Sequence, residues 1–320
     1  MANNLLVRVR VPASTSNVGP GYDVLGIALK LYNVIEVYSG SSCGCRCAKE
    51  FIRIEGEGAD SLPGDASNIV WRAIMKAMKY SSGSPKSKGI HVGAQNLRVR
   101  MINRIPLARG LGSSAAAKLG GLLAGNELCG KPLTQEEILD IAAGMEGHPD
   151  NVTPSLYGGL CISMVNGKSV KFLKMDIPKD LACVVCVPDF ELFTAKARSV
   201  LPEKVSHKDA AYNISRVSIL IGALAKRDYS LLKYAMEDKL HQNYRKGLIP
   251  GFDDVLKNGY SAGALGIALS GAGPSVFAFV AKRKASGVGR AMEKGFAKRG
   301  RHSRSLILGF DSEGAKVERV

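Results

Sequence analysis

Hydrophobic and polar residues alternate near the start of the chain. Residues 5–11, Leu-Leu-Val-Arg-Val-Arg-Val, have the period of two that is typical of a strand with one buried face. Pro12 ends the alternation, and the glycine-rich and polar residues that follow predict a loop that presents its side chains. Apolar runs over residues 31–38 and 97–102 predict two further strands.

Apolar residues recur at helical spacing elsewhere. Residues 65–80 place their apolar side chains on one stripe and their basic side chains outside it, which predicts an amphipathic helix. Thr134 and Glu137 have the spacing of a capping box, so we expect a helix that begins there and closes at Gly147. A long helical region is expected over residues 207–243.

One uncharged stretch is long enough to span a bilayer. Residues 259–281 contain no charged side chain, and about 20 apolar residues suffice for a transmembrane helix. The sequence Ser-Gly-Ala-Gly-Pro-Ser at residues 270–275 interrupts this stretch, which favours two buried strands joined by a glycine turn. Residues 1–4 lead directly into the first strand, so no signal peptide is expected and a cytoplasmic location is predicted.

Length and composition fit a globular protein of two domains. The chain has 320 residues, of which 46% are hydrophobic and 22% charged. Its formal charge of +16 would suit nucleic acid. Basic residues are concentrated over residues 282–304, but apolar residues at helical spacing there predict an amphipathic helix with a solvated basic face. The charge alone does not distinguish a nucleic-acid-binding protein from an enzyme for small anionic ligands, because a positive field attracts both.

The seven cysteines are an odd number, and without a secretion signal we expect them to be reduced. Cys43, Cys45 and Cys47 form one cluster, which fits a soft metal ion or, more commonly, a turn that carries free thiols. Cys183 and Cys186 lie in an apolar run at a spacing that puts them on opposite faces of a strand, so both are expected in the core.

The segment Gly-Leu-Gly-Ser-Ser-Ala-Ala-Ala at residues 110–117 carries the strongest local sign of chemistry. Glycines followed at once by a helix leave free backbone N–H groups at the positive end of the helix dipole, which suits a phosphate. The hydroxyls of Ser113 and Ser114 add contacts for phosphate or Mg²⁺. The P-loop pattern GxxxxGK[ST] occurs nowhere in the sequence. The alternative is close packing of a glycine- and alanine-rich helix.

Polar side chains gather directly after the helix that ends at residue 147. Glu146, His148, Asp150 and Asn151 lie within a few positions of one another. In a kinase, such carboxylates bind Mg²⁺ and position or deprotonate the attacking hydroxyl. The alternative is a helix end followed by an Asx turn. The second glycine turn, at residues 270–275, is either an anion-binding nest or a tight hairpin.

Other polar residues suit a charged small substrate. Arg198, with Thr194 nearby, and Arg245 supply guanidinium forks of the kind that bind carboxylate or phosphate. Asn17 and Asp23, in the loop after the first strand, could bind an amine or a hydroxyl. Each residue also has an ordinary explanation, because isolated arginines are mostly solvated and Asn and Asp often stabilise loops.

Taken together, these motifs resemble the GHMP kinases. Residues 12–23 resemble the first motif of that family, residues 106–117 its phosphate-binding second motif, and residues 270–275 its third. The resemblance covers nearly the whole chain. It implies an α+β fold with an ATP-binding N-terminal domain over residues 1–165, similar to domain 2 of ribosomal protein S5. A ferredoxin-like C-terminal domain over residues 166–320 would follow, with the nucleotide held between the two.

The resemblance also implies an ATP and Mg²⁺ site. Asn68 and Ile69 would border the adenine, the second motif would surround the phosphates, and Ser114 and Glu146 would ligate Mg²⁺. The residues implied in ATP binding are Asn68, Ile69, Pro106, Arg109, Gly110, Leu111, Gly112, Ser113, Ser114 and Ala115.

Within the family, the sequences NVGPGYDVLG, EGHPDNVTPSLYGG and TxxxR resemble the branch that phosphorylates L-homoserine to O-phospho-L-homoserine in threonine biosynthesis. This resemblance implies that Asp23 takes the substrate ammonium group and that Arg198 and Arg245 take its carboxylate. The other residues implied in substrate binding and catalysis are Asn17, His148, Thr194, Asp150 and Asn151. Asp150 is a candidate general base, since some family members use an equivalent carboxylate and others do not.

Two other interpretations stay open. A GHMP kinase for a mevalonate-like or sugar acceptor would share the ATP site, but neither acceptor offers both an ammonium group and a carboxylate. A non-catalytic member that binds a ligand or nucleic acid would have no need of Ser114, Glu146 and Asp150. A homodimer is expected only by analogy with such enzymes, and neither a membrane nor a nucleic acid is expected as a partner.

Overall fold

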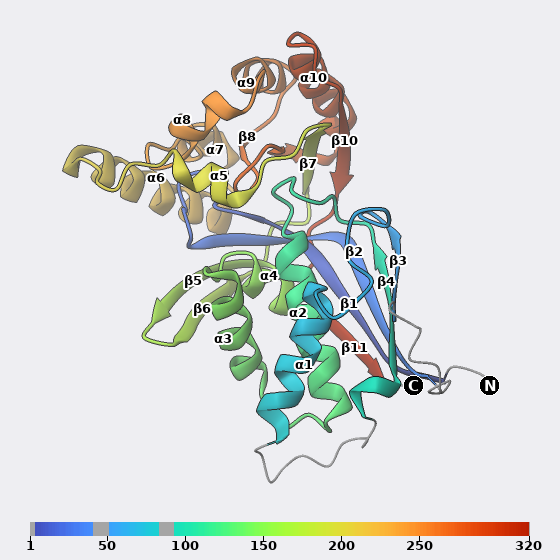
Figure 1. Ribbon diagram of the computed structural model, residues 1–320. Coiled ribbons are helices and arrows are strands. Elements are labelled where there is room, and N and C mark those ends of the chain that lie inside the picture. Colours follow the sequence, from blue (N-terminus) through green and yellow to red (C-terminus); the bar gives the residue numbers. More distant parts are fainter. Residues whose placement is uncertain (1–3, 41–50, 83–92, 320) are drawn as a thin grey trace.

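The computed structural model describes residues 4–40, 51–82 and 93–319. The cluster of Cys43, Cys45 and Cys47 lies outside the described residues. The described chain builds two β-sheets, each covered by helices, one in the lower and one in the upper half of Figure 1. The α+β class expected from the sequence is confirmed.

The larger sheet has the strand order β11-β1-β2-β4-β3, and β5 extends it by pairing with β2 and β6. Only β3 and β4 run parallel among the described pairs of this sheet, because α1 connects them. Its strands are β1 (Asn4–Ser16), β2 (Leu25–Ser39), β3 (Ile52–Gly56), β4 (Leu97–Asn103), β5 (Leu160–Asn166), β6 (Ser169–Met175) and β11 (Lys316–Arg319).

Four helices accompany this sheet, and α1 and α2 pack closely together. They are α1 (Ile69–Ser82), α2 (Ser113–Leu128), α3 (Gln135–Glu146) and α4 (Val152–Tyr157), and a 3₁₀ turn, Ala94–Asn96, precedes β4. A Cβ at Gly121 would lie 2.5 Å from the Val70 carbonyl oxygen, and one at Gly125 would lie 2.6 Å from that of Ile74. Glycine is therefore required for α2 to lie against α1.

The first strand is longer than its alternation predicts. We expected it to end at Pro12, but β1 continues to Ser16. The pairing with β2 shifts register between Pro12 and Ala13, and such an irregularity accommodates a proline that cannot donate to the ladder. The extra residues include Ser14 and Ser16, both of which are buried.

The smaller sheet has the order β10-β7-β9-β8 and is antiparallel throughout. Its strands are β7 (Leu181–Pro188), β8 (Gly266–Leu269), β9 (Val276–Ala281) and β10 (Ser303–Leu308). Strands β8 and β9 form the buried pair with a glycine turn that the sequence predicts. Cys183 and Cys186 are both buried and belong to different core clusters, as expected for opposite faces of one strand.

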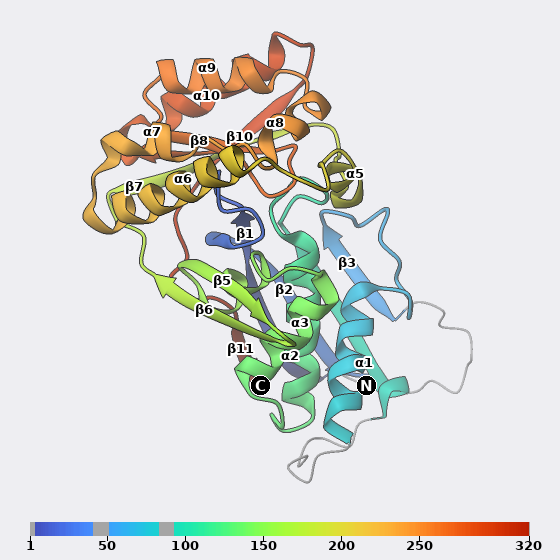
Figure 2. The same cartoon turned by 90° about the vertical axis from the view of Figure 1, so that its left-hand side faces the viewer.

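Helices lie on both sides of this sheet (Figure 2). They are α5 (Thr194–Ser199), α6 (His207–Lys226), α7 (Leu232–Ala235), α8 (Gln242–Arg245), α9 (Phe252–Ser261) and α10 (Ala285–Ala297), with 3₁₀ turns at Tyr229–Leu231, Lys246–Leu248 and Lys282–Lys284. The helical region expected over residues 207–243 is divided into shorter helices, because Arg227 adopts a left-handed φ of 57° and ends α6. None of the helices in the described ranges is both long and apolar enough to cross a membrane.

The chain returns to the larger sheet at its end. β11 pairs with β1, and β6 pairs with β5, although both follow residue 166 in the sequence. Asp311 secures the return, since its carboxylate accepts hydrogen bonds from the Tyr32 hydroxyl at 2.8 Å and from the backbone N–H of Gly314 at 2.6 Å. A division that keeps both sheets intact therefore falls between β6 and β7.

Candidate active site

A cavity of about 650 Å³ is lined by segments from both halves of the structure, the larger sheet with its helices and the smaller sheet with its helices. Residues 14–23 of the first motif, the loop before α2, the loop after α3, helix α5 and the β8–β9 turn all meet there (Figures 1 and 2). The cavity is lined by every residue that the sequence implies in binding or catalysis except Ala115. Ala115 is fully buried in the core, so its smallness serves packing rather than contact with a ligand.

The loop before α2 has the backbone shape of an anion site. Gly110 and Gly112 have left-handed φ values of 73° and 70°, which only glycine adopts without strain. A Cβ on Gly110 would lie 2.0 Å from the Ser270 carbonyl oxygen, and one on Gly112 would lie 2.2 Å from Ser14 Oγ. The three sequence motifs therefore touch at this loop. The 16-residue helix α2 begins here, and Ser113 and Ser114, whose backbone N–H groups belong to its first turn, line the cavity.

Ser114 and Glu146 meet at the edge of this loop. The Ser114 hydroxyl donates to Glu146 Oε2 at 3.1 Å. Lys118, one turn further along α2, donates to the Met145 carbonyl oxygen at 2.9 Å and also to Glu146 Oε2. A hydroxyl and a carboxylate are oxygen donors of the type that Mg²⁺ prefers, so the residues present fit such an ion.

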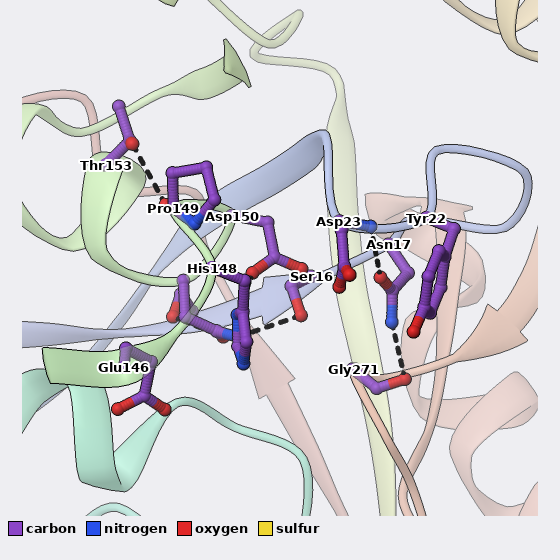
Figure 3. A network of polar contacts seen from close by, with 12 residues as sticks. Ser16, Asn17, Tyr22, Asp23, Glu146, His148, Pro149, Asp150, Thr153 and Gly271 are labelled. Carbon is purple, nitrogen blue, oxygen red and sulfur yellow. Dashed lines mark hydrogen bonds and ion pairs between the residues drawn. The ribbon is translucent and has the colours of Figure 1, made fainter. Parts of the chain in front are cut away.

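Asp150 and His148 form a close pair in the loop after α3 (Figure 3). Asp150 is 1% exposed, and its Oδ1 lies 2.5 Å from His148 Nδ1. Burial lowers the pKa of His148, but the hydrogen bond and charge of Asp150 outweigh it and raise that pKa overall. One ligand atom each of Asp23, His148 and Asp150 lies within 4.8 Å of the others. The two carboxylates thus offer oxygen acceptors close together, which suits the ammonium group of a substrate.

The loop that carries Asn17 and Asp23 has a strained but well-fixed backbone. Both residues have positive φ values, 66° and 55°. Asn17 Oδ1 accepts from the Asp23 backbone N–H at 3.0 Å, while its Nδ2 donates to the Gly271 carbonyl oxygen at 2.8 Å (Figure 3). Asn17 therefore holds the first and third motifs together as well as lining the cavity.

Arg198 of α5 spans the cavity to reach Asp23. Its two terminal nitrogens lie 3.1 Å and 2.8 Å from the Asp23 carboxylate oxygens, and one of them also donates to the Tyr22 hydroxyl at 2.8 Å. Burial lowers the pKa of Arg198, but Asp23 raises it overall. Asp23, implied in binding the substrate ammonium group, and Arg198, implied in binding its carboxylate, thus neutralise each other in this structure.

Arg245 lies behind Tyr22 and is 1% exposed, although it lines the cavity. Its Nε donates to the Ala197 carbonyl oxygen at 3.1 Å, and one terminal nitrogen lies 3.2 Å from His241 Nδ1. Since a guanidinium only donates, His241 accepts there, and its Nε2–H donates to the Gly19 carbonyl oxygen at 2.7 Å. Burial lowers the pKa of His241, which agrees with a neutral ring.

Asn151 connects its loop to the end of β1. Its Oδ1 accepts from Ser14 Oγ and its Nδ2 donates to Ser16 Oγ, both at 2.9 Å. Ser16 also lines the cavity, beside Asp150 in Figure 3. Asn151 therefore fixes the side chains of Ser14 and Ser16, which form a buried polar group at the cavity.

Asn68, Ile69 and Arg109 also line the cavity. Asn68 Oδ1 accepts from the Val70 N–H at 2.9 Å and its Nδ2 donates to the Pro63 carbonyl oxygen at 2.7 Å. The Arg109 guanidinium donates to the carbonyl oxygens of Pro188 and Asp189, so it connects the loop before α2 to the end of β7.

The sequence did not single out Lys118, Tyr22 or His241. Lys118 follows Ser114 by one helical turn, and this spacing was the available signal. Tyr22 stands directly before Asp23, and its ring lies within 5.6 Å of the Arg198 guanidinium carbon and 5.3 Å of that of Arg245. His241 precedes Arg245 by four residues, but nothing in the sequence shows that both are buried.

Comparison with known proteins defines the class. Residues 68–159 match the model of the GHMP kinases N terminal domain, and residues 220–298 match that of the GHMP kinases C terminal domain. The chain belongs to the GHMP kinase family, and it is an ATP-dependent kinase with a small-molecule acceptor.

Within this family, homoserine kinases are similar over the whole length. The chain is 40% identical to the homoserine kinase of Desulfitobacterium hafniense, across 98% of this chain and 100% of the relative. It is 41% identical to that of Persephonella marina, across 98% of both. The solved homoserine kinase of Cytophaga hutchinsonii superposes with a TM-score of 0.83 at 32% identity, covering 98% of this chain and 97% of the other. A solved mevalonate kinase at 17% identity, with a TM-score of 0.69 across 96% and 99%, shares the fold alone.

Proposed function

We propose that this chain transfers the γ-phosphoryl group of ATP to the side-chain hydroxyl of L-homoserine. The product would be O-phospho-L-homoserine, on the route to threonine. The observation that carries this proposal is the placement of Asp23, Arg198 and Arg245 in one cavity with the phosphate loop. Full-length similarity to homoserine kinases supports it.

The charges at the acceptor end fit a zwitterion. The Asp23 carboxylate would bind the substrate ammonium group, and the guanidinium groups of Arg198 and Arg245 would bind its carboxylate. Asp23 and Arg198 pair with each other at 2.8 Å in the absence of substrate. When a zwitterion binds, its ammonium group would replace Arg198 beside Asp23, and its carboxylate would replace Asp23 beside Arg198. A sugar has neither charge and mevalonate has no ammonium group, so either would leave this pair poorly compensated.

Ser114 and Glu146 would hold Mg²⁺ together with the nucleotide phosphates. When bound, this ion neutralises charge on the transferring phosphoryl group. The N–H groups at the start of α2 would hold the phosphates in place, which is the larger part of catalysis in phosphoryl transfer. Lys118 holds the Glu146 carboxylate at the loop through its own hydrogen bond.

Asp150 is our candidate for the group that accepts the proton of the acceptor hydroxyl. It is buried, lines the cavity and is oriented by His148 at 2.5 Å. Asn151 would fix the neighbouring backbone through Ser14 and Ser16.

We further propose a cytoplasmic enzyme of two domains, without a membrane or nucleic-acid partner, that forms a homodimer. We place the division after β6 rather than after residue 165, with β11 returning to the first domain, because β5 and β6 form one hairpin. The basic side chains near residues 282–304 lie on and around α10, away from the cavity residues.

The test is release of ADP from Mg-ATP, measured with L-homoserine, mevalonate, galactose or no acceptor. We expect turnover only with L-homoserine. Turnover with mevalonate or galactose would contradict the acceptor assignment and leave the ATP site standing. Absence of turnover with every acceptor, by a protein that still binds ATP, would favour a non-catalytic member of the fold.

A further inference from the structure

Ser16, the last residue of β1, carries a buried hydroxyl at the cavity. Its side chain lines the cavity, and the residue is 2% exposed. Its Oγ accepts a hydrogen bond from Asn151 Nδ2 at 2.9 Å. A hydroxyl also has one proton to donate, and within residues 4–40, 51–82 and 93–319 no group accepts the proton of Ser16. Ser16 therefore offers a hydrogen-bond donor to a ligand in the cavity.

Ser14 sets the direction of this hydrogen-bond chain. Ser14 Oγ donates to Asn151 Oδ1, and Asn151 Nδ2 donates to Ser16 Oγ. If the Asn151 amide were turned over, Ser16 would donate to it and the proton of Ser14 would lose its acceptor. Ser14 is fully buried and does not line the cavity, so no ligand could accept a proton there. The unpaired proton is therefore less costly on Ser16, where a ligand can accept it.

On one side, Ser16 is connected to the loop that would hold the nucleotide phosphates. Asn151 joins it to Ser14, and a Cβ on Gly112 of that loop would lie 2.2 Å from Ser14 Oγ. The loop before α2 and the hydroxyls at the end of β1 are thus in direct contact.

On the other side, Ser16 adjoins the acceptor end of the cavity. The next residue, Asn17, accepts from the backbone N–H of Asp23 at 3.0 Å. Asp150, our candidate for the proton acceptor, is drawn beside Ser16 in Figure 3 and also lines the cavity. A phosphoryl group that passes from the nucleotide to the acceptor would cross this part of the cavity.

We propose that the Ser16 hydroxyl donates a hydrogen bond to the phosphoryl group while it is being transferred. This inference rests on the proposed kinase function and adds a catalytic residue to it. In the transfer, the acceptor oxygen forms a bond to phosphorus, the bond from phosphorus to the ADP oxygen breaks, and the acceptor proton passes to Asp150. Ser16 keeps its own proton. Because charge spreads over the phosphoryl oxygens in the transition state, a donor fixed in advance stabilises that state more than the bound substrates.

The first test measures binding and needs no turnover. Aluminium fluoride beside Mg-ADP mimics the planar phosphoryl group in transfer. The ADP dissociation constant is measured by titration calorimetry with and without aluminium fluoride, each in the presence and in the absence of L-homoserine. We expect aluminium fluoride to tighten ADP binding to the unaltered protein, and this factor should fall about tenfold in Ser16→Ala, the value of one hydrogen bond to a charged group. Binding of ADP alone should not change.

A purely structural role of Ser16 predicts a different result. It would alter both ADP affinities alike, or the free energy of unfolding alone, and leave the factor unchanged. The same factor in Ser16→Ala and in the unaltered protein would therefore overturn the proposal. An unaltered protein whose affinity for ADP does not rise with aluminium fluoride would overturn it as well.

The second test separates kcat from KM. Ser16→Ala should lower kcat by about 10- to 100-fold and change KM for L-homoserine by less than about threefold, because the lost contact forms only in the transition state. Ser155→Ala is the matched control, since Ser155 is also fully buried, donates to the Pro12 carbonyl oxygen of the same strand at 3.1 Å and does not line the cavity. It should keep its kcat. An equal fall in both variants, or a rise of KM for L-homoserine without a fall in kcat, would refute the role of Ser16.

Ser14→Ala tests the direction of the chain. Without the Ser14 hydroxyl, the Asn151 amide can turn over and accept the proton of Ser16, which is then lost to the ligand. Although Ser14 does not line the cavity, this variant should lose part of the effect of aluminium fluoride. A Ser14→Ala protein that keeps the full effect would contradict a chain directed by Ser14.

If Ser16→Ala does not fold, Ser16→Cys replaces it, because a thiol is only a weak donor. Its aluminium fluoride factor should fall in the same direction, and an unchanged factor would count against the proposal. Failure of the kinase proposal would appear separately, as absence of homoserine-dependent turnover by the unaltered protein. The aluminium fluoride factor measured without L-homoserine would still decide for or against Ser16.

Discussion

Arg198 offers the sharpest test of how the acceptor is recognised. Its guanidinium makes two contacts with Asp23, at 2.8 Å and 3.1 Å, and we expect it to exchange Asp23 for the substrate carboxylate. Arg198→Ala removes these contacts without leaving a buried charge, because the Asp23 side chain is 33% exposed and can be hydrated. The variant should therefore fold.

The magnitude follows from the lost contact. A hydrogen bond to a charged group contributes about 1.5–3 kcal/mol, which corresponds to roughly a 10- to 150-fold loss in kcat/KM for L-homoserine. KM for ATP should stay nearly constant, because the phosphate loop lies across the cavity. The analogue 3-aminopropan-1-ol lacks the carboxylate, so Arg198→Ala should use it at least as well as the unaltered protein does. Removal of Arg198 even frees Asp23 for the ammonium group.

Arg216→Ala is the matched control. Arg216 also pairs with a carboxylate, that of Glu237 at 3.2 Å, and its side chain is 29% exposed against 37% for Arg198. Arg216 does not line the cavity. Steady-state ADP release with both acceptors provides the measurement. Equal losses with L-homoserine and 3-aminopropan-1-ol, or an equal rise of KM for ATP, would refute the reasoning.

Three further perturbations address the rest of the site. Glu146→Gln should cut turnover and raise the Mg²⁺ concentration for half-maximal rate by at least about tenfold; a Mg²⁺ titration that gives the same midpoint would place the ligand elsewhere. The pKa of His148 is raised above its ordinary value of 6.5, so its pair with Asp150 stabilises the fold fully at acidic pH and loses this effect as pH rises through the raised pKa. Urea unfolding of His148→Asn between about pH 5.5 and 9 should show a deficit that shrinks with rising pH, and a growing deficit would contradict the sign. Gly110→Ala should lower the free energy of unfolding by roughly 1–3 kcal/mol, because its Cβ would lie 2.0 Å from the Ser270 carbonyl oxygen; unchanged denaturation would show that the loops can separate.

Features that depend on residues close together in the chain could be predicted from the sequence. The capping box at Thr134 and the left-handed Gly147 at the end of α3 are both present, since each depends on residues a few positions apart. The glycine turn between β8 and β9 is equally local. The three motifs also line one cavity as their resemblance to the GHMP kinases implied.

Contacts between distant segments could not be predicted. Ser14 and Asn151 are 137 positions apart in the chain, yet their side chains bond in the buried floor of the cavity. The neutral state of His241 depends on its burial between the first motif and Arg245, which no local pattern encodes. Similarly, Ala115 belongs to the second motif, but the packing of α2 turns it into the core.

The pairing of β1 with β11 has a consequence for synthesis of the chain. A ribosome makes β1 before the smaller sheet and β11 after it, so one edge of β1 has no native partner until the strands of the smaller sheet have been made. An unpaired edge is a template for association with other chains. Charged side chains on an unpaired strand disfavour such association, and β1 carries Arg8 and Arg10 along the segment that pairs with β11. The larger sheet is therefore completed only after the smaller sheet has been made.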